Sequence, residues 1–128
     1  MLFLQQYQDV LTLSSANLEK ISQFAILLKK YNNQVNLVSK NAINSLEINH
    51  ILDSLMILKF VSFPENSLVG DMGSGGGFPG LILAMARPKV KFVLMECTQK
   101  KCVFLVLMAR KFNLKNARIA SLTCVANF

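Results

Sequence analysis

The sequence predicts an α/β protein in which a helical N-terminal part precedes a β-α-β-α-β unit built on a parallel sheet. Two apolar runs of strand length, at 68–72 and 90–95, alternate with helical patterns, and this alternation is typical of βαβ connections. Four glycines occur within residues 73–77, directly after the first run. A strand, a glycine turn and a helix start in this order are typical of a nucleotide-binding loop. We expect residues 1–66 to form the helical region and residues 67–128 the α/β region of one domain.

The helical part contains three predicted helices. Residues 2–12 predict a short helix that is broken at Ser14 and Ser15. A second helix is predicted from there to Tyr31, and a third over about 42–60. The second helix is indicated by apolar residues three and four apart, which form one stripe: Leu18, Ile21, Ala25 and Leu28.

Three polar residues of the third predicted helix, His50, Asp53 and Ser54, are candidates for a site. Their spacings of three and four residues make their side chains neighbours on one helical face. The alternative is a local hydrogen-bonded pair of His50 and Asp53 at the junction of the two regions. A Ser-His-Asp triad is not implied, because the members of such triads come from distant segments.

The α/β region begins after a linker at 63–67. Its first strand, 68–72, is too apolar to alternate, so we expect it to be buried on both faces. A helix over 79–86 ends before Arg87-Pro88, since the residue before proline disfavours helix. The second strand, 90–95, follows.

The last two predicted elements are a helix and a strand. Thr98 is expected to cap the helix. The centre of that helix, 102–109, is apolar on every side, so we expect most of its surface to be covered. A third strand over about 117–122 completes the unit.

Asp71 decides which ligand the glycine loop favours. The segment 75–80 also matches the dinucleotide pattern G-x-G-x-x-G. A carboxylate two residues before the first glycine would repel a pyrophosphate, whereas it suits the ammonium and sulfonium groups of S-adenosylmethionine. Glu96 ends the second strand, twenty-three residues after Gly73, where such folds place an acid that binds the ribose hydroxyls. We therefore expect S-adenosylmethionine, with a dinucleotide as the alternative.

The composition of the chain restricts the possible classes of protein further. The chain has 128 residues, of which 52% are apolar, but no apolar run approaches the ~18 residues of a membrane span. With no signal peptide pattern, we expect a cytoplasmic protein without a membrane partner. Three cysteines fit neither a redox pair nor a zinc site, so we expect reduced thiols and no metal.

The net charge of +7 is concentrated in the second half of the chain. Residues 64–128 contain nine Lys and Arg against three Asp and Glu, whereas residues 1–63 contain five against four. This asymmetry favours a polyanionic partner such as nucleic acid. A solvated, lysine-rich surface is the alternative.

Three motifs together resemble one protein family. They are Tyr31-Asn32 with Asn36-Leu37, His50 to Leu55, and Asp71 to Gly80. The sequence is similar over residues 18–118 to the RsmG family, also called glucose-inhibited division protein B. The resemblance implies S-adenosylmethionine-dependent methylation of the ring nitrogen at position 7 of a guanine in 16S ribosomal RNA of the small subunit. It also implies a class I, Rossmann-like methyltransferase fold, of which the three strands are the first half.

The resemblance implies site residues as well. Cofactor contacts are expected from these residues: Asp71, Gly73, Ser74, Gly75, Phe78, Glu96, and through their backbones Val125 and Ala126. The uneven charge, rather than the resemblance, predicts RNA contacts from Lys100, Lys101, Arg110 and Lys111; of these, the pair Lys100-Lys101 also belongs to the family's pattern. No catalytic base is expected, because this ring nitrogen attacks with a lone pair and has no proton to lose. His50, Asp53 and Ser54 are then at most positioning groups.

The sequence departs from the family pattern at several positions. Tyr31 replaces the usual Trp, and Asn49 stands where an Arg usually precedes the His. The family follows its third strand with an Arg, a small residue and two acids, whereas this chain reads Cys124-Val125-Ala126-Asn127-Phe128. The alternative function is therefore a truncated, non-catalytic remnant, the product of a frameshift or early stop, that at most binds cofactor or RNA.

Overall fold

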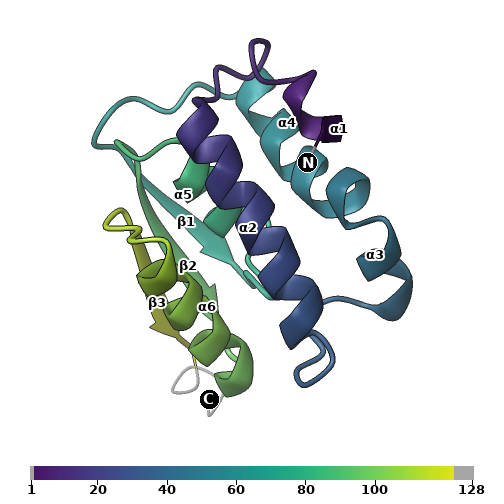
Figure 1. Cartoon of the computed structure of the whole chain (residues 1–128). Helices are drawn as coiled ribbons and strands as arrows, with labels where there is room; N and C mark the ends of the chain where they lie inside the picture. The colour runs from purple at the N-terminus through teal and green to yellow at the C-terminus, as the bar shows by residue number, and fades with distance from the viewer. Residues whose placement is uncertain (1, 123–128) are drawn as a thin grey trace.

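The computed structural model describes residues 2–122, which form a helical part and a three-stranded sheet (Figure 1). The strands are β1 (Leu68–Met72), β2 (Lys91–Glu96) and β3 (Ala117–Ser121). The helical elements are α1 (Leu2–Gln5), α2 (Ser15–Tyr31), α3 (Lys40–Asn44), the π-helical segment η1 (Glu47–Leu52), α4 (Asp53–Phe60), α5 (Gly80–Ala86) and α6 (Gln99–Lys111).

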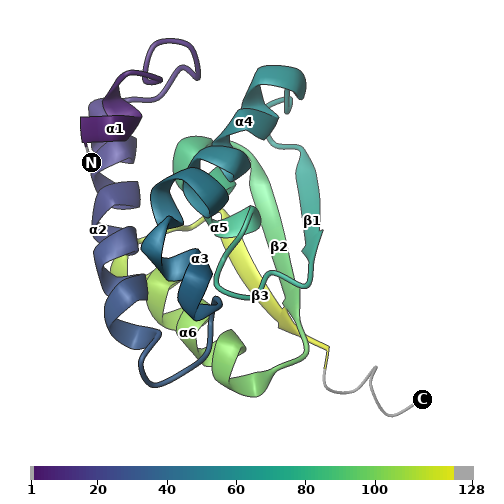
Figure 2. The ribbon, with the colours of Figure 1, turned by 90° about the vertical axis from the view of Figure 1, so that its right-hand side faces the viewer.

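The sheet is parallel, with the strand order β1-β2-β3. Leu68 pairs with Lys91 and Met72 with Met95, so the ends of β1 and β2 are level. The helices α5 and α6 connect the strands and lie on one face of the sheet, and α2 packs outside them (Figures 1 and 2). The predicted β-α-β-α-β unit, with the helical part before it, is confirmed.

Helix α2 joins the helical part to the α/β unit. Ser14 caps its start, since its hydroxyl accepts a hydrogen bond from the Asn17 N–H at 3.0 Å. The predicted apolar stripe is buried, together with Phe24. The N-terminal segment is fixed to the end of α5 by Arg87, whose guanidinium donates to the carbonyls of Leu11 (2.8 Å) and Thr12 (3.1 Å).

Two predicted helices are shorter or more broken than expected. The helix predicted over 2–12 ends at Gln5 and continues as turns. The helix predicted over 42–60 is divided into α3, η1 and α4. Ser45 leaves the helical conformation at φ −124°, and its hydroxyl accepts a hydrogen bond from the Asn49 amide at 2.6 Å.

The prediction that β1 is buried on both faces is wrong. Its residues alternate between exposed and half-buried, and Leu68 and Met72 are 69% and 77% exposed. Among the described residues the helices cover only the other face of the sheet (Figure 2), so the apolar residues of β1 that point away from them remain in solvent.

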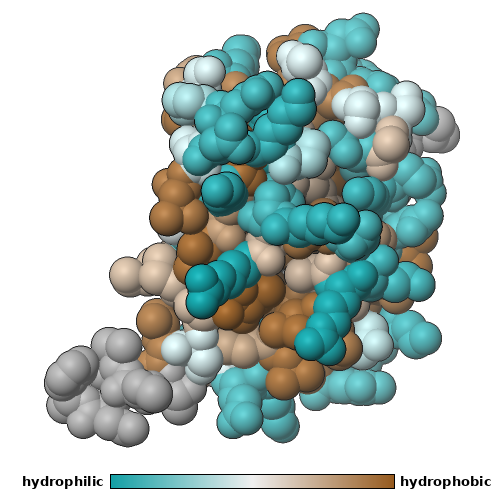
Figure 3. All heavy atoms as spheres, turned by 90° about the vertical axis from the view of Figure 1, so that its left-hand side faces the viewer, coloured by the Kyte–Doolittle hydropathy of each residue, from teal (hydrophilic) through white to brown (hydrophobic). Residues whose placement is uncertain are grey.

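The coverage predicted for α6 is also only partly correct. Cys102, Phe104, Leu105 and Met108 are buried, but Val103 is 53% and Leu107 is 42% exposed. Figure 3 shows apolar side chains at the surface on the side of the molecule where α6 and β3 lie. Thr98 precedes α6 but, contrary to expectation, makes no capping bond through its side chain. Its backbone N–H binds the Glu96 carboxylate.

Candidate functional site

The glycine loop joins β1 to α5 and is shaped by three glycines in the left-handed region. Their φ angles are +76° at Gly73, +54° at Gly75 and +104° at Gly77, which residues with a Cβ rarely adopt. A Cβ at Gly73 would meet no atom within 4 Å. The loop therefore borders open space at the carboxyl end of β1.

Ser74 and Asp71 make bonds within this loop. Ser74 is buried, and its hydroxyl donates to the Asp71 carbonyl at 3.2 Å. One oxygen of the Asp71 carboxylate accepts the N–H of Gly80 at 2.9 Å, at the start of α5. A negative charge is favourable at a helix N-terminus, so Asp71 stabilises the turn from the loop into the helix. Its contact with a cofactor stays a prediction.

Glu96 connects the end of β2 to the glycine loop. One carboxylate oxygen accepts the N–H of Gly75 at 2.9 Å, and the other accepts the N–H of Thr98 at 2.7 Å. The side chain is only 5% exposed. The Cys102 thiol donates to the Glu96 carbonyl at 3.2 Å, so both the backbone and the side chain of this residue are held.

The hydrogen bonds to Glu96 determine its ionisation. Burial raises the pKa of the Glu96 carboxyl, but the backbone N–H groups of Thr98 and Gly75, the Thr98 hydroxyl and the charge of Lys101 lower the pKa by more. The net pKa lies below that of an ordinary Glu. The carboxylate is therefore charged at neutral pH and can accept further hydrogen bonds.

The helical part packs directly on the glycine loop. The Asn32 side-chain oxygen accepts the N–H groups of Leu37 (2.9 Å) and Val38 (3.0 Å), which fixes the turn after α2. A Cβ at Gly76 would lie 3.3 Å from the Leu37 carbonyl oxygen, so a residue larger than glycine would push this turn away. Sequence reasoning named Asn32 within the Tyr31-Asn32 motif but did not foresee these two bonds, although an Asn just after a helix is typical of such turns.

His50, Asp53 and Ser54 line one cavity beside the loop. The cavity has a volume of about 410 Å³, and its walls also include Asn49, Ile57, Phe78 and Pro79. The His50 ring stacks on Phe78, with centroids 4.9 Å apart. The Ser54 hydroxyl donates to the His50 carbonyl at 2.6 Å. Within residues 2–122 no hydrogen bond joins the His50 and Asp53 side chains, so the paired alternative is not formed there.

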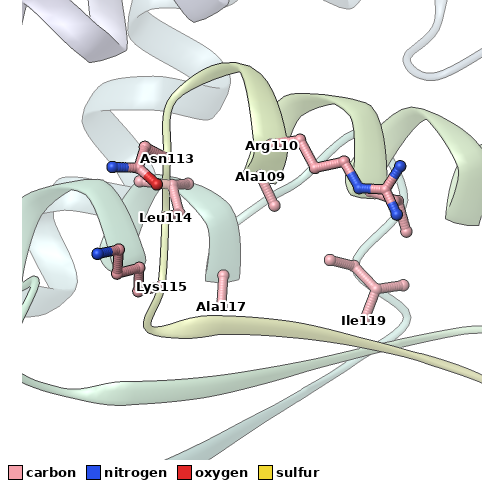
Figure 4. Close-up of a pocket in the computed structure, with 8 residues that line it drawn as sticks. Ala109, Arg110, Asn113, Leu114, Lys115, Ala117 and Ile119 are labelled. Atoms are coloured by element: carbon pink, nitrogen blue, oxygen red, sulfur yellow. The ribbon is translucent and has the colours of Figure 1, made fainter.

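The four basic residues expected at an RNA surface lie in two pairs. Lys100 and Lys101 are in the first turn of α6 and Arg110 and Lys111 in the last, about 15 Å apart along the helix. Lys101 is close enough to Glu96 to lower its pKa. Arg110 instead borders a cavity of about 440 Å³ between α6 and β3, toward Ile119 (Figure 4).

Some of the residues singled out in the sequence do not belong to this site, and others lie outside the residues that the structure describes. Val125 and Ala126, and also Cys124, lie outside the described residues. Cys97 and Cys102 are free thiols. Within residues 2–122 no three His, Cys, Asp or Glu side chains gather as a metal site requires. None of the helices in that range has the length and apolar character of a membrane span.

These features define a class of protein. The chain contains a Rossmann-like α/β unit. Its strands are parallel, a glycine loop follows the first strand, and an acid stands at the tip of the second. The sequence identifies the family within this class: a family model described as rRNA small subunit methyltransferase G matches residues 17–123. The chain belongs to this family.

Individual relatives agree with this assignment. A protein of Chlorobium phaeobacteroides named ribosomal RNA small subunit methyltransferase G is 37% identical over 110 residues, which is 86% of this chain and 50% of the relative. Proteins of the same name are 39% identical in Ruegeria pomeroyi (80% of this chain, 52% of the relative) and 44% identical in Rickettsia felis (69% and 45%). The chain thus spans about half the length of the curated relatives it matches.

The low pKa of Glu96 leads to a prediction about acid stability. Because its folded pKa is lowered, Glu96 stabilises the fold above its unfolded pKa, and this contribution is lost as the pH falls through the folded pKa. We expect Glu96→Gln to lower the free energy of unfolding at pH 7 by about 1.5–3 kcal/mol and to lose less stability on acidification than the wild type. Urea unfolding at pH 7 and below pH 4 measures both.

The control for this measurement is Glu65→Gln, since Glu65 is exposed and makes only a surface ion pair with Lys89 at 3.4 Å. This variant should stay within about 1 kcal/mol of the wild type. An equal effect of the two variants would show that Glu96 does not hold the loop.

Proposed function

We propose that this chain binds S-adenosylmethionine and takes part in methylating the ring nitrogen at position 7 of a guanine in 16S ribosomal RNA. The observation that carries the proposal is the buried Glu96 carboxylate, which accepts a hydrogen bond from the Gly75 N–H of the glycine loop. The family to which the chain belongs is one of methyltransferases. The cofactor supplies a methyl group on a positively charged sulfur. The residues of this chain bind and orient it, and no proton has to be removed from the acceptor nitrogen.

The shape of the loop supports a cofactor of this kind. Gly73 and Gly75 border open space, and a Cβ at Gly75 would have only the Gly73 carbonyl oxygen near it, at 3.9 Å. Glu96 uses two lone-pair positions for Gly75 and Thr98. The Thr98 hydroxyl also bonds to this carboxylate, so of the about four such positions on a carboxylate one remains for a ribose hydroxyl.

The charges at the loop argue against the dinucleotide alternative. A pyrophosphate needs free N–H groups at a helix N-terminus, but the Gly80 N–H of α5 is already bound by Asp71. The Asp71 and Glu96 carboxylates would repel its negative charges, whereas they attract the ammonium and sulfonium groups of S-adenosylmethionine.

Isothermal titration tests the cofactor. We expect S-adenosylmethionine and its demethylated product to bind and NAD not to bind. Glu96→Ala should weaken S-adenosylmethionine binding by about 1.5–3 kcal/mol, the range for hydrogen bonds to a charged group, while Glu65→Ala should leave binding unchanged. Tight NAD binding, or full affinity in Glu96→Ala, would remove Glu96 and its loop from a methyl-donor site.

Methyl transfer is tested separately from binding. The chain is incubated with small-subunit RNA that lacks the methyl group, and transfer of a labelled methyl group is measured. Transfer to guanine N7 supports the enzymatic proposal. Cofactor binding without transfer supports the alternative of a non-catalytic protein that only binds cofactor or RNA.

The basic residues of α6 give a prediction for RNA binding. Each lost phosphate contact lowers the slope of log affinity against log salt by about 0.7 for single-stranded RNA. Replacing Lys100 and Lys101 by Gln should therefore lower the slope by about 1.4. Fluorescence anisotropy at several salt concentrations measures the slope.

The matched control replaces Lys91 and Lys115 by Gln. Both are exposed and border a cavity at the opposite end of the strands, which Glu65 also lines. The same change in net charge there should leave the slope nearly unchanged. Equal slopes for the two double variants, or affinity that does not depend on salt, would contradict an RNA surface at the start of α6.

A further inference from the structure

The cavity of about 410 Å³ beside the glycine loop has the size of a small-ligand pocket. Most of its wall comes from η1 and α4, and the rest is Phe78 and Pro79 at the end of the glycine loop. The pocket therefore borders the loop that the proposed function assigns to a methyl donor.

Asp53 brings a carboxylate to the wall of this pocket, where a ligand can reach it. The Ser54 hydroxyl is already bonded to the His50 carbonyl, and the Asn49 amide is bonded to the Ser45 hydroxyl at 2.6 Å. The Asp53 carboxylate is exposed, and within residues 2–122 it has no hydrogen-bond or ion-pair partner.

The pocket also has an aromatic wall. His50 and Phe78 are stacked, with 30° between the ring planes, and Phe78 also makes an edge contact with Phe24, at 6.0 Å between centroids. Aromatic side chains of this kind are the usual contacts of bases that have left a nucleic-acid stack. One wall of the pocket is thus apolar and flat, and another carries a carboxylate.

We infer that this pocket binds an unstacked guanine, with the Asp53 carboxylate accepting hydrogen bonds from the guanine N1–H and N2 amino group. The inference rests on the proposed function and specifies which residue reads the base. A bidentate contact of this kind fits a carboxylate, which is an acceptor only. Adenine would instead present the lone pair of its N1 to the carboxylate, which repels it.

The geometry of guanine connects this contact to the reaction. The N1–H and N2 amino donors lie on the Watson–Crick edge, whereas N7 and O6 lie on the opposite, major-groove edge. A guanine held by Asp53 through its donor edge therefore keeps the N7 lone pair free. Asp53 is in this account a specificity residue, and no proton passes to it.

The experiment measures base selectivity with the purified chain. The probe is a short fluorescein-labelled RNA of uridines with one central guanosine, and matched probes carry inosine, adenosine or 7-deazaguanosine at that position. Inosine lacks only the N2 amino group, and 7-deazaguanosine lacks only N7. We expect guanosine and 7-deazaguanosine to bind equally, and inosine and adenosine to bind about tenfold or more weakly, by fluorescence anisotropy.

Variants assign the selectivity to Asp53. Asp53→Asn should reduce the guanosine-to-inosine ratio to near one, while Glu65→Gln, which removes the same charge at the other end of the strands, should keep the wild-type ratio. Circular dichroism shows whether Asp53→Asn is folded. If Asp53→Asn is unfolded, the affinities of the wild-type chain for the guanosine and inosine probes still test the inference. Equal affinity for the two probes, or no measurable RNA binding, overturns it.

The outcome separates this inference from the proposed function. S-adenosylmethionine binding without guanosine selectivity overturns the role of Asp53 and leaves the methyl-donor site in place. Guanosine selectivity without S-adenosylmethionine binding supports the pocket and contradicts the proposed function. Selectivity that Asp53→Asn retains in a folded state overturns the assignment to Asp53.

Discussion

The Glu96 carboxylate is the contact on which the arrangement of the site depends. It is buried at the tip of β2 and binds the N–H of Gly75 in the glycine loop and the N–H of Thr98 before α6. A buried charge is costly unless it is fully hydrogen-bonded, and these bonds both keep it charged and fix two loops to one strand.

The helical part is a second support of the site. The turn held by Asn32 packs on Gly76, and the Phe78 ring contacts both Phe24 of α2 and His50 of η1. The loop proposed to bind a cofactor and the pocket proposed to bind a base thus share Phe78. A change in the position of η1 would therefore affect both, and π-helical segments like η1 are frequent at functional sites.

Much of the fold could be predicted from the sequence, because its signals are local. The strand at 68–72, the glycine loop and the acid at Glu96 follow from apolar runs and residue types. Burial of β1 on both faces could not be predicted correctly, because an apolar run does not reveal which elements cover a strand. The break near Ser45 was missed because helical apolar spacing continues through it.

The candidate site was predictable as a set of residues but not as a set of contacts. Glu96, Asp71 and the His50 cluster were found from their spacing, but their bonds to Gly75, Gly80 and Phe78 were not foreseen. Asp71 and Glu96 were read only as ligand contacts. Each also holds the loop backbone, and sequence patterns do not indicate such side-chain to backbone bonds between distant positions.

The most direct test of the central role of Glu96 is an acid titration of the Gly75 and Thr98 amide signals by NMR. A carboxylate that binds both N–H groups predicts that the two amide signals shift together, with one midpoint below the ordinary Glu pKa of about 4.3. Glu96→Gln should abolish both shifts. Amide signals that do not respond to acid, or that share a midpoint at or above the ordinary value, would contradict the account.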